Sequence, residues 1–221
     1  MSKNVVIIGA NRGIGLELVK QYKAAGHHVI AMCRKSSKAL SESGCEIVEN
    51  IDVTDDALVE NIAASVPVAS IDILIHNSGI LDPDTINSID FESMRRHFDV
   101  NSLGALRTVL GLQSKLKNGS KIGIVSSRVG SIDDNTGSNN YAYRVSKTAV
   151  NMVGKCLSID LKDAGIAVAL LHPGYVRTEM TKHNGHMDVD ESARGLIKRM
   201  EELSLDTSGI FVHTSGEVLN W

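Results

Sequence analysis

The sequence is poor in proline and cysteine, and it has neither long apolar runs nor an excess of basic residues. Its 221 residues include only three prolines and three cysteines, while 43% are hydrophobic and 22% are charged. These proportions are those of an ordinary folded protein, and they exclude a disordered, collagen-like or coiled-coil chain. The length allows one large domain or two small ones.

The cysteines and the apolar runs bear on the compartment. Cys33, Cys45 and Cys156 are odd in number and show no C-x-x-C spacing, so no disulfide framework and no metal site is expected. Apolar stretches such as residues 166–171 are far shorter than the roughly 18 residues of a membrane helix. Residues 1–8 lack the cleavage site and the apolar length of a signal peptide. We expect a cytoplasmic protein with no membrane partner.

The chain also lacks a surplus of positive charge. Its 23 lysines and arginines face 26 aspartates and glutamates, which gives a formal net charge of −3 at pH 7. Binding to a polyanion depends on clustered cations that release counterions. Nucleic acid is therefore not an expected partner.

What the sequence does contain is a regular alternation of two kinds of segment. Short β-branched runs predict buried strands at residues 5–8, 28–32, 46–51, 71–75, 121–125, 166–171 and 210–213. Segments of helical character lie between them, at residues 13–25, 55–65, 91–117, 141–164 and 190–203. The alternation predicts an α/β fold with a doubly wound, mostly parallel sheet of about seven strands and helices on both faces. No linker or repeat interrupts it, so residues 1–221 are expected to form one domain.

A glycine-rich turn follows the first predicted strand. Gly9, Gly13 and Gly15 form a G-x-x-x-G-x-G pattern where that strand gives way to a helix. Glycines there permit a tight turn and a close approach of the backbone to a pyrophosphate, whose charge is met by the amino end of the helix. The same glycines could form an ordinary strand-to-helix turn without a ligand. The surrounding βα alternation favours a dinucleotide site of the Rossmann type instead.

The residues after the second predicted strand indicate which dinucleotide. An NAD site normally offers a carboxylate here to the ribose 2′-hydroxyl, but this sequence has Arg34. A guanidinium can bind a 2′-phosphate through two hydrogen bonds, so Arg34 and Arg12 favour NADP(H), unless both are merely solvated surface charges. Asp52 could accept a hydrogen bond from the adenine amino group, or it could cap a helix together with Thr54.

A tyrosine and a lysine later in the chain indicate acid–base chemistry. Tyr143 and Lys147 are four residues apart in a predicted helix and therefore share a face. A nearby ammonium stabilises phenolate and should lower the pKa of the tyrosine toward the operating pH. Such a pair also arises by chance on helices, but the glycine turn upstream strengthens the catalytic interpretation. Tyr141 and His172 are competing candidates, although Tyr141 lies on another face and a strand-end histidine is more often simply buried.

Taken in order, these motifs resemble the short-chain dehydrogenase/reductase family over essentially the whole chain. The glycine turn, residues 77–79, residues 143–147 and residues 173–178 correspond to motifs of that family. Within the family, residues 141–144 and 216–221 are most similar to the C-factor and Sniffer-type carbonyl reductases.

The resemblance implies a role for each catalytic candidate. Tyr143 would be the general acid and Lys147 would also hold the nicotinamide ribose. Ser127 would donate to the substrate carbonyl oxygen, with Ser126 as the fallback. Asn101 would anchor a water that links Lys147 to solvent. The residues expected to bind the cofactor are Gly9, Asn11, Arg12, Gly13, Ile14, Gly15, Arg34, Asp52, Val53, Asn77, Ser78, Gly79, Tyr143, Lys147, Pro173, Gly174, Val176 and Thr178.

The expected function is NADPH-dependent reduction of a small ketone, aldehyde or quinone, or the reverse oxidation of an alcohol. The alternative is an NADP-binding regulatory protein without significant turnover, because C-factor-like members of the family have been regarded as signalling proteins. The substrate loops at residues 78–89, 129–140 and 175–189 do not identify the substrate. Family members commonly pair through helices that correspond to residues 91–117 and 141–164, which predicts a homodimer.

Overall fold

Seven parallel strands form one sheet in the computed structural model, which describes residues 1–221. The sheet order is β3-β2-β1-β4-β5-β6-β7, and every adjacent pair is parallel. The strands are β1 (Asn4–Ile8), β2 (His28–Met32), β3 (Glu46–Val48), β4 (Ile71–His76), β5 (Leu116–Val125), β6 (Ala167–His172) and β7 (Ile210–His213). The predicted doubly wound α/β fold is confirmed.

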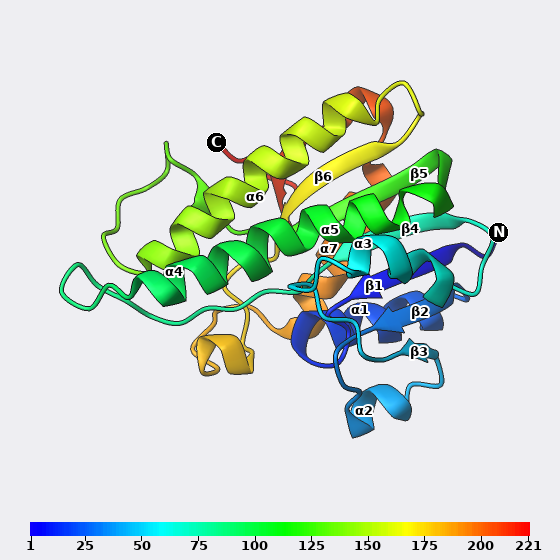
Figure 1. Cartoon of the computed structure of the whole chain (residues 1–221), viewed down its shortest axis with the longest axis horizontal. Coiled ribbons are helices and arrows are strands. Elements are labelled where there is room, and N and C mark those ends of the chain that lie inside the picture. Colours follow the sequence, from blue (N-terminus) through cyan, green and yellow to red (C-terminus); the bar gives the residue numbers. More distant parts are fainter.

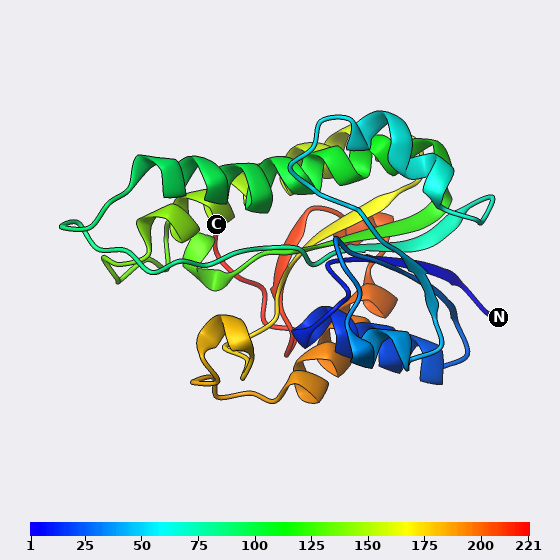
Figure 2. The ribbon, with the colours of Figure 1, turned by 60° about the horizontal axis from the view of Figure 1, so that its bottom comes forward.

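Helices cover both faces of this sheet (Figures 1 and 2). They are α1 (Gly13–Ala24), α2 (Lys38–Ser41), α3 (Leu58–Asn61), α4 (Phe91–Phe98), α5 (Gly104–Leu112), α6 (Tyr141–Asp160) and α7 (Val189–Glu202). Figure 2 shows α1 and α7 below the sheet, and α4, α5 and α6 above it. No helix combines the length and the apolar character needed to cross a membrane.

Strand β1 shows how the sequence builds these layers. Neighbouring side chains of a strand point to opposite faces, so Val6 and Ile8 pack in the core under α3, α5 and α6, whereas Val5 and Ile7 pack in the core above α1 and α7. All four are essentially inaccessible to solvent. Burial on both faces explains why the strands read as continuous apolar runs instead of alternating ones.

Several predicted boundaries were wrong. The predicted helix 91–117 is interrupted by a π-helical turn at Asp99–Leu103, and its last residues belong to β5. Strand β5 therefore begins earlier than predicted, and it contains an irregularity in which Leu116 pairs with Ile71 but Lys121 pairs with Ile73. A run of polar residues inside the irregularity hides the start of this strand from an apolar pattern.

The remaining differences lie at the ends of elements. Helix α6 ends at Asp160 instead of residue 164, and a turn with Gly165 at φ +73° leads into β6. Strand β3 ends at Val48 instead of residue 51. The predicted helix 55–65 is reduced to α3 and a 3-10 turn at Ile62–Ser65, and the short helix α2 was not predicted.

Parallel strands bring all their carboxyl ends to one edge of the sheet. The glycine turn follows β1, Arg34 follows β2, Asn77 follows β4, Ser127 follows β5 and Pro173 follows β6. The strand order reverses between β1 and β4, and ligands of such sheets bind in the crevice at that point. The fold thus gathers at one edge motifs that are far apart in the sequence.

Candidate active site

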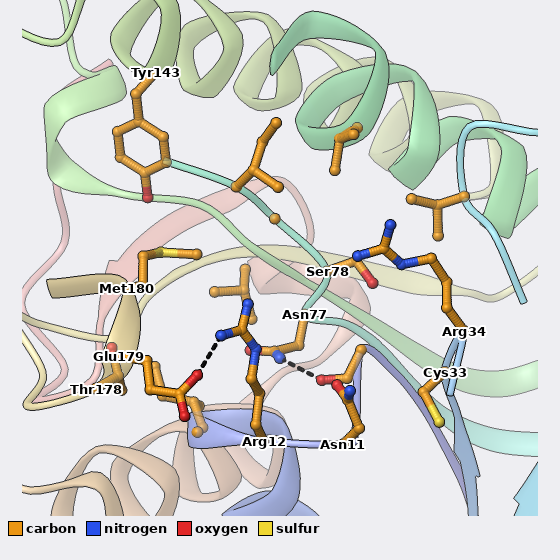
Figure 3. Close-up of a pocket in the computed structure, with 18 of the residues that line it drawn as sticks. Asn11, Arg12, Cys33, Arg34, Asn77, Ser78, Tyr143, Thr178, Glu179 and Met180 are labelled. Carbon is orange, nitrogen blue, oxygen red and sulfur yellow. Dashed lines mark hydrogen bonds and ion pairs between the residues drawn. The ribbon is translucent and has the colours of Figure 1, made fainter. Parts of the chain in front are cut away.

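A cavity of about 910 Å³ lies at this edge of the sheet (Figure 3). Most of the predicted cofactor residues line it: Gly9, Asn11, Arg12, Gly13, Ile14, Arg34, Asp52, Val53, Asn77, Ser78, Gly79, Tyr143, Lys147, Pro173 and Thr178. Gly15, Gly174 and Val176 do not. The cavity also includes residues that the motifs did not single out, among them Thr54, Val100, Arg177 and Met180. Arg177 and Met180 belong to the predicted substrate loop at residues 175–189, and Thr54 follows the predicted contact Val53. Val100 is brought to the cavity by the fold, and no local pattern singled it out.

The glycine turn is shaped by close backbone contacts. Gly9 has φ +78°, and a Cβ there would lie 2.8 Å from the backbone nitrogen of Ser78. A Cβ on Gly15 would lie only 2.1 Å from the carbonyl oxygen of Gly9. Gly15 therefore supports the turn and does not itself line the cavity. Its contact with the cofactor stays a prediction.

Two further predicted contacts also shape the site from outside the cavity. Gly174 has φ +87°, and a Cβ there would lie 3.1 Å from the sulfur of Met187. Val176 is 2% exposed and pairs with Met187 in an isolated bridge. Both residues pack against Met187 and so help to fix the path of the segment after β6.

Asn77 ties the two central loops together. Its Nδ2 donates to the carbonyl oxygen of Gly9 at 2.9 Å, and its backbone nitrogen donates to the carbonyl oxygen of Ile8 at 3.0 Å. The first of these bonds is drawn in Figure 3. The side chain lines the cavity while holding the glycine turn against the loop after β4.

The two predicted phosphate-binding arginines have different surroundings (Figure 3). Arg34 is exposed at the cavity and forms no ion pair, whereas Arg12 pairs with Glu179 in the segment after β6. Asp52 accepts hydrogen bonds from the backbone nitrogen of Thr54 at 3.0 Å and from its hydroxyl at 2.8 Å. These bonds, together with the charge of Arg34, hold the pKa of Asp52 below its ordinary value. The same bonds hold a turn at residues 52–54. The helix-capping role that the sequence left open is not found, because the next helix, α3, begins at Leu58 and has no side-chain cap.

Tyr143 and Lys147 share one face of α6, as their spacing predicts. The lysine Nζ lies 5.7 Å from the centre of the tyrosine ring and donates to the carbonyl oxygen of Val125 at 2.9 Å. Lys147 is 3% exposed, and burial lowers its pKa to about 8. Burial raises the pKa of Tyr143 to about 12, with Ser127 acting in the opposite direction. The predicted lowering of the tyrosine pKa by Lys147 is wrong, because the loss of hydration outweighs the other influences.

The two serines after β5 differ in their partners. The Ser126 hydroxyl donates to Oδ1 of Asn151 at 2.5 Å inside the protein, although the residue also lines the cavity. Ser127 is 9% exposed, and its hydroxyl is close enough to Tyr143 to affect the pKa of the phenol. Ser127 is therefore the better partner of Tyr143, although it does not itself line the cavity.

Asn101 lies within the π-helical turn and connects three segments. Its Oδ1 accepts from the backbone nitrogen of Ile80 at 2.8 Å, and its Nδ2 donates to the Ile80 carbonyl at 3.0 Å and to the Ser146 hydroxyl at 2.9 Å. Single π-helical turns are often found at functional sites. The residue is 1% exposed and stays outside the cavity, so its role in holding a water stays a prediction.

The competing acid–base candidates are less well placed. Neither Tyr141 nor His172 lines the cavity. Burial lowers the pKa of His172 to about 3, and its ring packs 5.0 Å from that of His213. His172 is therefore neutral near pH 7, and Tyr143 is the one of the three candidates that faces the cavity.

Comparisons with known proteins agree with this arrangement. Residues 3–188 match the family described as short chain dehydrogenase. The 1-hydroxy-2-glutathionyl-2-methyl-3-butene dehydrogenase of Rhodococcus sp. (strain AD45) is 39% identical over 98% of this chain and 99% of its own. The C-signal protein of Myxococcus xanthus is 34% identical over 72% of this chain and 98% of its own.

A solved structure has the same fold as this chain. The NADPH-bound carbonyl reductase from chicken fatty liver has a TM-score of 0.91 and 30% identity, over 100% of this chain and 99% of that one. The family match covers the glycine turn, the tyrosine and the lysine. From these matches and the site geometry we conclude that the chain belongs to the short-chain dehydrogenase/reductase family.

Proposed function

We propose that this protein is an NADP(H)-dependent oxidoreductase that reduces the carbonyl group of a small molecule. The observation that carries the proposal is one cavity that contains both Tyr143 beside Lys147 and the unpaired Arg34. The same cavity draws residues from Gly9 to Val189, which supports the interpretation of residues 1–221 as one domain.

The residues present fit NADP(H). Gly9 and Gly13 keep the turn free of Cβ atoms at the amino end of α1, where a pyrophosphate is bound most favourably. Arg34 forms no ion pair, although its charge helps to lower the pKa of Asp52, and its guanidinium can bind a 2′-phosphate, which an acidic residue would repel. The solved carbonyl reductase with NADPH bound supports the same cofactor.

The chemistry of reduction needs a hydride and a proton. Bound NADPH supplies the hydride. Tyr143, whose pKa of about 12 keeps it protonated at neutral pH, donates its phenolic proton to the carbonyl oxygen. Ser127 donates a hydrogen bond to the same oxygen and stabilises the developing charge. Lys147 positions the cofactor, and its ammonium loses its proton above a pH of about 8.

The alternative is a regulatory protein that binds NADP(H) without turnover. The similarity to the C-signal protein, whose name indicates signalling, is the reason to consider this alternative. A buried lysine held at 2.9 Å from a main-chain carbonyl, one helical turn from a tyrosine in the cavity, favours the enzyme. Its desolvation is costly, and nucleotide binding alone does not require it.

The test is an NADPH-oxidation screen against ketones, aldehydes and quinones, with Tyr143→Phe as the variant. A glutathione-conjugated alcohol with NADP⁺ tests the reverse direction, because the Rhodococcus relative carries such a name. Loss of a positioned general acid should lower the rate by about 10² to 10⁴ while NADPH binding persists. Tyr141→Phe is the matched control and should keep its activity.

Two results would contradict the proposal. A Tyr143→Phe rate above about a tenth of the original would exclude the phenol as the acid. NADPH binding by the unmutated protein, with no turnover of any substrate in either direction, would favour the regulator.

A further inference from the structure

Helix α6 carries Tyr143 in its first turn, but it has no cap of its own. The residue before the helix, Asn140, is left-handed with φ 56° and ψ 46°, and its side chain makes no capping bond. The first amide groups of a helix have no partner within the helix and must find one elsewhere. The start of the catalytic helix therefore depends on another part of the chain.

The carboxylate of Asp84 provides that partner. Its Oδ1 accepts from the backbone nitrogen of Tyr141 at 2.5 Å, and its Oδ2 accepts from that of Ala142 at 3.0 Å. The Asp84 carbonyl also accepts from the backbone nitrogen of Asn140 at 2.9 Å. Asp84 is 57 residues away from Tyr141 in the sequence, in the loop after β4. By contrast, α4 is capped locally by Asp90, which accepts from the amide of Glu92.

The loop that carries Asp84 is itself anchored. The backbone of Ile80 is held by Asn101 through bonds of 2.8 and 3.0 Å. The backbone nitrogen of Asp82 donates to Nε2 of the buried His97 at 3.0 Å, and its carboxylate pairs with Arg96. These bonds tie the loop to α4 and the π-helical turn, and the Asp84 bonds tie it to the beginning of α6.

The two catalytic residues of α6 depend on this connection to different extents. Lys147 lies one turn further along the helix, and its Nζ donates to the carbonyl oxygen of Val125. Its backbone packs closely against Gly130, since a Cβ on Gly130 would lie 2.7 Å from the Lys147 carbonyl carbon. Tyr143 lies within the first turn, one residue after the amides that Asp84 holds. Loss of the Asp84 bonds should loosen Tyr143 while leaving Lys147 in place.

We propose that Asp84 is a positioning residue for the proton donor: its carboxylate fixes the first turn of α6 and thereby holds Tyr143 in the reactive position. This inference rests on the proposed function. Displacing a reacting group by about 1 Å can lower the rate about 100-fold. Asp84 should therefore act on kcat and leave NADPH affinity, which depends on Arg34, Lys147 and the glycine turn, nearly unchanged.

The experiment compares Asp84→Ala with Asp84→Asn. We expect kcat to fall about 10- to 100-fold in Asp84→Ala, with the Kd of NADPH changing less than about threefold. The amide oxygen of Asp84→Asn can still accept one N–H bond, so this variant should recover most of the rate. The control is Asp72→Ala. Asp72 is also half-buried and accepts a distant backbone N–H, from Asn4 at 2.8 Å, but it lies at the other end of the sheet. This control should lower Tm without changing kcat.

A second readout works without turnover. Amide hydrogen exchange of Tyr141 and Ala142 should become about tenfold faster in Asp84→Ala, while that of Val150 stays protected. Unchanged exchange at these two amides would overturn the proposal even if the protein had no enzymatic activity. Faster exchange combined with an unchanged kcat would also overturn it, since Asp84 would then be an ordinary helix cap. Absence of turnover in the unmutated protein would instead contradict the proposed function alone.

Discussion

At the scale of single residues, Arg34 differs from the other arginines of the cavity. Arg12, Arg95, Arg96 and Arg177 each pair with a carboxylate, and Arg34 does not. An unpaired guanidinium beside a nucleotide cavity can bind a phosphate without first breaking an ion pair. This supports Arg34, ahead of Arg12, as the residue that selects NADP(H).

Arg34→Ala should reduce the preference for NADPH over NADH. A charged hydrogen bond contributes roughly 1.5–3 kcal/mol, so the ratio of the two dissociation constants should narrow by about one to two orders of magnitude. Fluorescence titration with NADPH and with NADH measures the two dissociation constants. Lys35→Ala removes a neighbouring exposed charge that does not line the cavity and should leave the ratio unchanged. Equal affinity of the unmutated protein for NADPH and NADH would exclude this interpretation.

At the scale of elements, one face of α6 contributes Tyr143 and Lys147 to the cavity, and another face exposes apolar side chains to solvent. Val145, Met152 and Ile159 follow one another at intervals of seven residues and are 49%, 65% and 65% exposed. Residues with this spacing form one stripe along a helix. The stripe supports the predicted homodimer, which the fold by itself does not test.

Met152→Glu should separate such a dimer, because it places a charge in the middle of the apolar stripe. Light scattering of the unmutated protein should give twice the chain mass of 23.8 kDa, and the variant should give the chain mass. Ile86→Glu is the control, since Ile86 is 66% exposed on a loop away from the stripe. A mass of 23.8 kDa for the unmutated protein at micromolar concentration would refute the homodimer.

At the scale of the whole molecule, a buried histidine couples stability to pH. His76 is 1% exposed at the end of β4, with Nδ1 lying 3.1 Å from the Thr108 hydroxyl and Nε2 unpartnered. Burial, together with the charge of Lys147, lowers its pKa to about 3. Between pH 6.5 and 3 the unfolded chain binds a proton at His76 that the native protein does not bind. Stability therefore decreases as the pH falls through this range, by at most about 1.4 kcal/mol per pH unit.

His76→Leu should make the protein less sensitive to acid. Urea unfolding at several pH values should show a shallower loss of stability between pH 6 and 4 than in the unmutated protein. His172, whose pKa is also lowered by burial, should keep part of the slope. An identical slope in the variant would show that His76 does not titrate on unfolding.

The sequence by itself determined the layers of the fold and located the main parts of the candidate site. Strands such as Val5 to Ile8 can be recognised because burial on both faces requires an uninterrupted apolar run. The glycine turn can be recognised because only glycine allows the backbone contacts around Gly9 and Gly15. The spacing of Tyr143 and Lys147 places them together through local helical geometry alone.

Only the tertiary structure decided features that depend on contacts between distant segments. The π-helical turn at Asn101 coincides with bonds from this side chain to Ile80 and Ser146, and such contacts between distant segments cannot be predicted from local propensity. The pairing of Arg12 with Glu179 joins residues 167 positions apart. The pKa of Tyr143 was predicted in the wrong direction, because desolvation depends on everything packed around the phenol, whereas spacing reports only one neighbour.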